Sequence, residues 1–189
     1  MTKTSEPLLT LEPFIDALRD GVTRAGWELS GLQKTTSQQF DGRWEGEDSR
    51  SAYLFFHCER VSDVVSIDAF LDETSKGLSG NLALVLEGPE LAGLGPMKGL
   101  LTSLARVTRA CLPRGYRMPI TVRLRLDGPD QDPDEAESEV RLKLLIPAGA
   151  VSAGADAVSA LATAAVAAFE CALRHPELEP LRFGVELGD

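Results

Sequence analysis

Four stretches of the chain alternate between apolar and polar side chains, and this period of two constrains the fold more than any other feature of the sequence. Alternation of this kind predicts β-strands that turn one face to a core and the other to solvent. It runs through residues 52–59, 65–72, 120–126 and 140–145. Residues 81–88 are instead apolar nearly throughout, which is typical of a strand covered on both sides. The sequence therefore predicts a sheet of five or more strands.

Three other stretches repeat apolar residues at every third or fourth position, which predicts amphipathic helices. They cover residues 11–25, 97–112 and 154–174. Gly26 and Pro113 follow the first two stretches and are typical helix stop signals. The third stretch is rich in alanine, so we expect it to approach a neighbouring element closely.

A short hairpin is predicted within residues 28–48, because Asp41-Gly42 is a favourable two-residue turn with Phe40 and Trp44 on its two sides. Hairpins interspersed with helices indicate the α+β class with a largely antiparallel sheet. The expected order is helix, hairpin, three strands, helix, two strands, helix. This order is similar to that of small bacterial chaperones that bind secretion substrates, although no sequence motif accompanies it.

The length of 189 residues suits one domain, and 43% apolar and 25% charged residues are ordinary for a globular protein. We expect a single globular domain over residues 1–189 with a short flexible N-terminus at residues 1–8. Residues 127–139 contain seven carboxylates and two prolines, which predicts a mobile acidic loop. Residues 181–187 are predicted to add a short strand.

The formal net charge of −10 argues against a nucleic-acid partner, because binding to phosphates needs clustered lysine and arginine. No uninterrupted apolar run reaches the roughly 18 residues that predict a membrane span. The N-terminus also lacks the apolar core of a signal peptide. These features predict a cytoplasmic protein without a nucleic-acid or membrane partner.

The three cysteines, Cys58, Cys111 and Cys171, are far apart and odd in number, and no Cys-x-x-Cys pair occurs. We therefore expect buried reduced thiols, with neither a disulfide framework nor a zinc site. Cys58 follows His57 directly, but adjacent residues of a strand point to opposite faces. His57 therefore cannot activate this thiol as a nucleophile, and Cys58 is interpreted as a packed core residue.

Two loops come close to ligand-binding motifs without matching them. Residues 88–99 are rich in glycine but depart from the phosphate-loop spacing, and Pro96 lacks the N–H that an anion needs at a helix start. Residues 130–134 have the Asp-x-Asp-x-Asp spacing of a calcium loop, but Glu135 and Arg141 replace the turn glycine and the bidentate glutamate. The sequence predicts no cofactor, no metal and no catalytic residue.

One candidate binding surface is aromatic. If the strands at residues 52–59 and 65–72 pair, one face gathers Tyr53, Phe55, His57, Asp68 and Phe70. Aromatic patches of this kind are enriched in the buried centres of interfaces. The face is either a second core layer beneath a helix, or a groove for a ligand or partner, or a dimer interface.

A second candidate surface is cationic. If the strands at residues 120–126 and 140–145 pair, one face carries Arg123, Arg125, Arg141 and Lys143. These cations either form a solvated face that protects a sheet edge or dock an acidic segment. The acidic segment could be the chain's own residues 127–139.

We expect a non-enzymatic protein-binding module of the chaperone or adaptor kind that forms a homodimer. Three helices of roughly 24 Å can cover only one side of such a sheet, and a twofold contact is the commonest way to bury the other side. Two alternatives remain open. One is an acidic inhibitor or immunity-type protein that covers a basic partner, and the other is a small enzyme with an aromatic-lined pocket.

Overall fold

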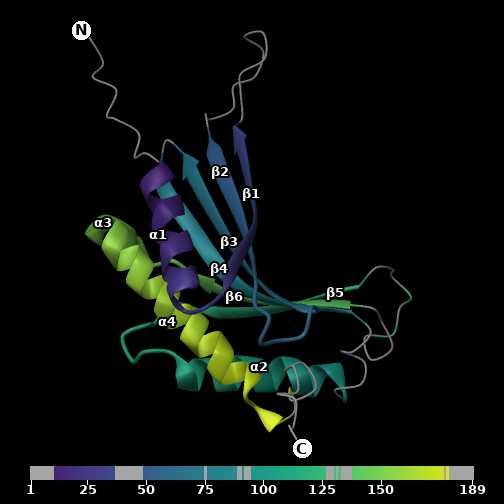
Figure 1. Ribbon diagram of the computed structural model, residues 1–189. Coiled ribbons are helices and arrows are strands. Elements are labelled where there is room, and N and C mark those ends of the chain that lie inside the picture. The colour runs from purple at the N-terminus through teal and green to yellow at the C-terminus, as the bar shows by residue number, and fades with distance from the viewer. Residues whose placement is uncertain are drawn as a thin grey trace, which may run out of the picture.

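The helices gather on one side of a six-stranded antiparallel sheet (Figure 1). The computed structural model describes residues 11–36, 49–74, 76–88, 91, 95–126, 130, 132, 138–176 and 178. In chain order the elements are α1 (Leu11–Arg24), β1 (Glu28–Thr36), β2 (Arg50–His57), β3 (Val65–Thr74), β4 (Gly77–Gly88), α2 (Met97–Cys111), β5 (Ile120–Arg125), β6 (Ser138–Leu145), α3 (Ala148–Ala153) and α4 (Ala155–Leu173).

The predicted α+β class is confirmed, and the order of elements roughly matches the prediction. The strands lie in the order β1-β2-β3-β4-β6-β5, and every neighbouring pair is antiparallel. Among the described residues, β1 and β5 are the two edges of the sheet. Two details differ from the prediction: β1 pairs with β2, with a register shift between Leu29 and Gly31, and the short helix α3 precedes α4.

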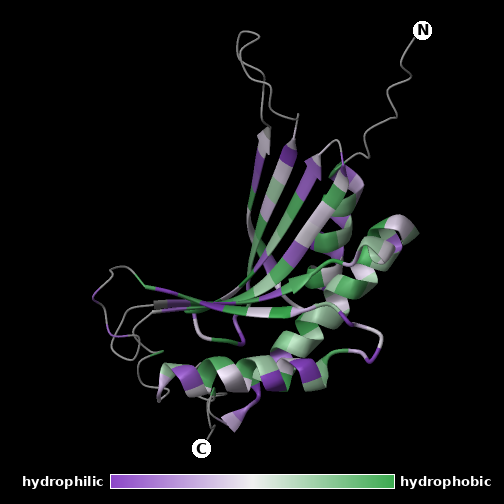
Figure 2. Ribbon diagram, turned by 180° about the vertical axis from the view of Figure 1, so that it is seen from behind, coloured by the Kyte–Doolittle hydropathy of each residue, from purple (hydrophilic) through white to green (hydrophobic). Residues whose placement is uncertain are grey.

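The strand alternation places one row of apolar side chains from each strand against the helices, on what we call the inner face. Ala52, Leu54 and Phe56 of β2 are fully buried there, and the inner rows of β3, β4 and β6 join them in one core. Figure 2 shows the alternation along the strands as bands of purple and green. The opposite side of the sheet is called the outer face.

Helix α4 is the central core helix. It is apolar and long enough to cross a bilayer by length and composition alone, but in this fold it packs against α1, α2 and β4. Helix α1 approaches it at Gly21, where an added Cβ would lie 2.4 Å from the backbone oxygen of Ser159 and 2.7 Å from the Cβ of Ala162. The Thr163 hydroxyl donates a hydrogen bond of 2.9 Å to the Gly21 carbonyl. The small residues expected in this helix thus permit the close crossing.

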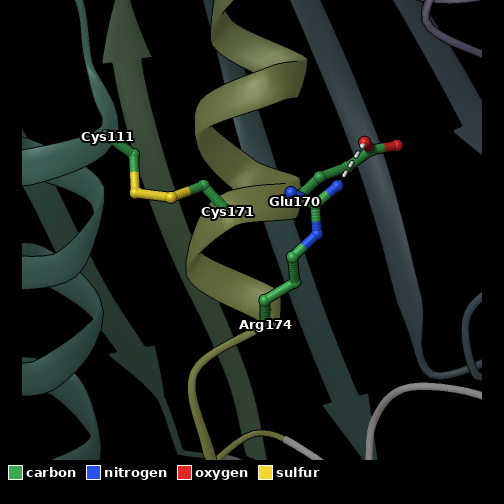
Figure 3. The surroundings of a disulfide bond; sticks show 4 residues. All are labelled: Cys111, Glu170, Cys171 and Arg174. Carbon is green, nitrogen blue, oxygen red and sulfur yellow. Dashed lines mark ion pairs between the residues drawn. A yellow bond between two sulfur atoms is a disulfide. The ribbon is translucent and has the colours of Figure 1, made fainter.

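The prediction of three reduced thiols is wrong for two of them. Cys111 at the end of α2 and Cys171 near the end of α4 form a disulfide with a Cα–Cα distance of 6.2 Å (Figure 3). On the other side of α4, Arg174 forms an ion pair with Glu170 at 3.8 Å. Spacing along the chain gave no sign of the bridge, because the two cysteines are 60 residues apart and meet only when α2 and α4 pack together. Disulfides persist mainly in oxidising compartments, so the bridge does not support the cytoplasmic location expected from the sequence, which stays a prediction.

Several predictions fall outside the described residues. These are the flexible N-terminus at residues 1–8, the turn at Asp41-Gly42 with Phe40 and Trp44, the strand at residues 181–187 and most of the acidic loop at residues 127–139. The loop boundary is corrected at one end, since Ser138 and Glu139 belong to β6.

Candidate docking surface

The outer face carries the residues of both candidate surfaces. The aromatic surface lies on β2 and β3, the cationic surface lies on β6 and β5, and β4 separates them. Strand register pairs Tyr53 with Phe70, Phe55 with Asp68, and Arg123 with Arg141. Both pairings on which the sequence hypotheses depended, β2 with β3 and β5 with β6, therefore occur. No helix among the described residues packs on this face, because the helices pack into the core on the inner side.

An apolar patch occupies one end of the outer face. It consists of Tyr53, Phe55, Phe70 and Leu145. Tyr53 is 39% exposed, Phe55 37% and Leu145 36%. The rings of Tyr53 and Phe70 lie 4.7 Å apart between centroids and are tilted by 40°, a geometry favourable for an aromatic pair. These exposures exclude the interpretation of this end as a second core layer beneath a described helix.

Leu145 was not among the residues singled out from the sequence. It belongs to the same register row as Tyr53 and Phe70, with Asn81 of β4 between Phe70 and Leu145. The signal was present, because Leu145 continues the outward positions Arg141 and Lys143 at a spacing of two.

An ion-pair network occupies the other end of the outer face. Arg141 contacts Asp68 at 2.9 Å through Nη1 and Glu139 at 3.1 Å through Nε. Arg125 contacts the other carboxylate oxygen of Glu139 at 3.4 Å. Glu87 lies directly opposite Glu139 on the neighbouring strand β4. Two of the four cations of the cationic candidate surface are therefore engaged by carboxylates of the sheet itself.

The pKa values of this network are set by burial and by the arginines. Burial raises the pKa of Asp68 more than the nearby Arg141 lowers it. Burial also raises the pKa of Glu87, and a hydrogen bond with Glu139 adds to the shift. Burial alone would raise the pKa of Glu139, but Arg141 and Arg125 lower it overall. The pKa of Glu139 is thus lowered, whereas the pKa values of its neighbours Asp68 and Glu87 are raised.

The outer face carries no net charge on strands β2 to β6, although the chain has a formal charge of −10. Four cations, Arg123, Arg125, Arg141 and Lys143, are matched by four carboxylates, Asp68, Asp72, Glu87 and Glu139. Arg123 and Lys143 form no ion pair with a described residue.

In the middle of the outer face, the side chains of Ala83 and Val85 of β4 are buried. Their register partners on β6 are Lys143 and Arg141, whose long side chains can cover them. Burial on both faces of β4 thus agrees with its apolar sequence.

His57 and Cys58 lie on opposite faces, as the alternation predicts. His57 is exposed, with Nε2 3.7 Å from Glu28 of β1. Cys58 is a buried free thiol, and its Sγ lies 3.5 Å from the Gly26 carbonyl oxygen.

Cys58 borders a small pocket of about 120 Å³ at the C-terminal end of α4. Arg60 and Trp27 both donate hydrogen bonds of 3.1 Å to Glu170 in this region. The pKa of Arg60 is raised, chiefly by its interactions with Cys58 and then by the charge of Glu170. These contacts tie the turn after α1 and the end of β2 to α4, so they have a structural role.

No group of three or more potential metal ligands occurs among the residues that the structure describes. Comparison with protein-family models, with curated proteins and with solved structures finds no match.

Proposed function

We propose that this protein is a non-enzymatic binding module that docks another protein chain on the outer face of its sheet. The observation that carries the proposal is the exposure of Tyr53, Phe55 and Leu145 on one face without a covering helix. Contiguous exposed apolar patches on soluble domains mark interaction sites. Sheets pack face to face through such side chains about 10 Å apart.

The occupant we propose is a second copy of the same chain. The outer face has no net charge on β2 to β6, so two copies can approach there with less repulsion than across the acidic remainder of the surface. The ion-pair network supports the same reading. Asp68, Glu139 and Arg141 already satisfy one another within each copy, so a twofold contact centred on the apolar patch can bury these three charges with their partners in place.

Two other functions receive less support. An enzyme needs a closed site with a nucleophile or paired acid and base groups, whereas the apolar patch is open to solvent. An acidic inhibitor of a basic partner would dock through carboxylates, yet the carboxylates Asp68 and Glu139 of the outer face are engaged by Arg141.

Light scattering coupled to gel filtration tests the proposal over a tenfold dilution series at micromolar concentration and moderate salt. We expect wild-type protein to elute with twice the chain mass of 20.3 kDa. Phe55→Asp should return the mass to 20.3 kDa, because it places a charge in the centre of the interface. Circular dichroism verifies that the variant is folded, and Tyr53→Ser is a milder second variant with the same expected effect.

Leu32→Asp is the matched control. Leu32 is an exposed apolar residue of the adjacent strand β1, 45% exposed, but its register partner is the inward-facing Leu54. It should leave the dimer intact. A wild-type mass of 20.3 kDa at every concentration would overturn the dimer, and dissociation by Leu32→Asp as well would overturn the assignment to the outer face.

A further inference from the structure

Helix α2 and the turn that follows it carry a basic surface in an otherwise acidic chain. Residues 96–119 contain five of the chain's 19 lysine and arginine residues and none of its 29 aspartate and glutamate residues. All five side chains are exposed, and Figure 2 shows purple, hydrophilic turns along α2. We call them the basic surface, and they are Lys98, Arg106, Arg109, Arg114 and Arg117.

The fold gathers these cations at one side of α2. Lys98, Arg106 and Arg109 lie within an arc of about 80° around the helix axis, because each residue of an α-helix turns by about 100°. Arg109 donates hydrogen bonds of 3.1 Å and 2.7 Å to the carbonyl oxygens of the residues before and after Arg117. These two bonds hold the turn after α2 against the end of the helix, so the backbone of Arg117 lies beside the Arg109 guanidinium group.

Pairing within the helix and the helix dipole do not explain Lys98 and Arg106. On α1, Arg19 pairs with Asp16 at 3.1 Å, one turn away, whereas no residue of the basic surface forms an ion pair with a residue that the structure describes. Arg106 has Arg109 three positions away, and like charges at this spacing destabilise a helix. Lys98 lies in the first turn, where the helix dipole disfavours a cation and no acidic residue accompanies it.

A short acidic segment complements this surface better than a large polyanion does. Charges act over about 8 Å at physiological ionic strength, so a short segment meets mainly the local cations. A bilayer or a nucleic-acid duplex would also approach the acidic remainder of a chain of net charge −10. A bilayer further requires apolar side chains at the contact, and the other exposed residues of α2 are Gly99, Thr102 and Ala110.

Single-stranded nucleic acid and a second copy of the chain fit this surface less well. Binding of single strands relies on stacking of bases on aromatic side chains, but Tyr116, the one aromatic residue of residues 96–119, is buried. Two copies that met through α2 around a twofold axis would bring their cations together. A contact between this surface and an acidic region of the next copy would be head-to-tail, which gives rings or open chains and not the dimer proposed above.

We propose that the basic surface binds a short acidic segment of a different protein. Carboxylates of the segment pair with Arg106, Arg114 and Arg117, each of which can hold a carboxylate through two parallel hydrogen bonds. Lys98 lies about 12 Å from Arg106 along the helix axis, a distance that about four residues of an extended segment span. This interaction does not depend on the apolar patch or on dimer formation.

Fluorescence anisotropy with two labelled eight-residue peptides tests the inference. One alternates glutamate with serine, and the other has glutamine in place of each glutamate. The glutamate peptide should bind wild-type protein at least about tenfold more tightly, and its binding should weaken as salt increases. The double variant Arg106→Glu, Arg117→Glu should lose this tenfold difference. The dimer variant Phe55→Asp should bind as wild type does.

The matched control is the double variant Arg24→Glu, Lys34→Glu. It changes the net charge by the same amount at two exposed cations outside the basic surface, and it should bind the glutamate peptide within about twofold of wild type. Circular dichroism verifies folding. Arg106→Glu should not lower the unfolding temperature, because it places a carboxylate three positions before Arg109. Arg106→Lys with Arg117→Lys keeps the charge and should retain most of the binding, also if the glutamate variant fails to fold.

Three results would overturn the inference: equal binding of both peptides, no binding of either, or equal weakening by the control variant. Two further probes are a single-stranded oligonucleotide of eight nucleotides and vesicles of phosphatidylserine and phosphatidylcholine. If either bound more tightly than the glutamate peptide and lost this binding in the Arg106→Glu, Arg117→Glu variant, the basic surface would be a site for that partner and not for an acidic protein segment.

Discussion

Removal of the Cys111–Cys171 bridge should cost a large part of the stability of this protein. The bridge joins the C-terminal ends of α2 and α4 across 60 residues of chain, and that segment includes β5, β6 and α3. When the bridge is intact, these elements remain in one closed loop in the unfolded chain. Reduction therefore raises the entropy of the unfolded state far more than it changes the folded one.

The expected magnitude follows from the loop length. The chain-entropy relation for a closed loop of this size gives about 4 kcal/mol at 25 °C, against a total of roughly 5–15 kcal/mol for a typical domain. With a urea dependence of about 2–3 kcal/mol/M, the unfolding midpoint should fall by about 1–2 M on reduction.

Urea unfolding followed by circular dichroism, with and without reductant, measures this difference. Cys111→Ser and Cys171→Ser should each reproduce the reduced protein and become insensitive to reductant. Cys58→Ala should keep the full response, because its thiol is free. Equal midpoints for oxidised and reduced wild-type protein would refute the reasoning.

A second experiment asks whether the bridge exists in the cell. Free thiols are blocked before cell lysis, and the mass of the protein then shows whether Cys111 and Cys171 were blocked or bridged. The result also tests the expected cytoplasmic location.

Three further predictions concern single side chains. Gly21→Ala should destabilise the protein by about 2 kcal/mol, because the added methyl group overpacks against α4. Gly99→Ala should instead stabilise α2 by up to about 1 kcal/mol, because no atom lies within 4 Å of its added Cβ. Denaturant titration measures both changes. The raised pKa of Glu87 means that its protonated form is favoured by folding, so wild type should lose stability relative to Glu87→Gln as pH rises from 4 to 7. The loss should be about half a kcal/mol, as for like charges across a strand pair, and parallel curves for the two proteins would contradict it. Cys58→Ala should cost about 1 kcal/mol without altering the mass in solution, and rapid labelling of Cys58 in the native state would contradict its role as a packed residue.

The fold was predictable wherever local periodicity carries the information. Alternation along β2, β3, β5 and β6 identified the strands and their inward side chains, because burial of one face imposes a period of two. The strand order was not predictable, since the placement of β6 between β4 and β5 depends on packing between distant segments. The same limit hid the Cys111–Cys171 bridge.

The candidate site was predictable in part. The alternation placed Phe55 with Phe70 on one candidate surface and Arg123 with Arg141 on another, but it could not tell that the two surfaces share one face of the sheet or whether a helix covers it. Glu139 was assigned to the acidic loop, so its ion pairs with Arg125 and Arg141 were missed. The outward spacing of Glu139, Arg141 and Lys143 contains that signal.

The central claim is that two copies meet through their outer faces, and the distance between spin labels tests it most directly. Ser79 is exposed on the outer face beside the apolar patch, and Ala160 is exposed on α4 at the opposite side. Sheets about 10 Å apart place two Ser79 labels within about 30 Å across a twofold axis through the patch, whereas two Ala160 labels lie much farther apart. We expect strong dipolar coupling between labels at Ser79 and weak coupling at Ala160. Coupling at Ala160 alone, or at neither position, would contradict the account.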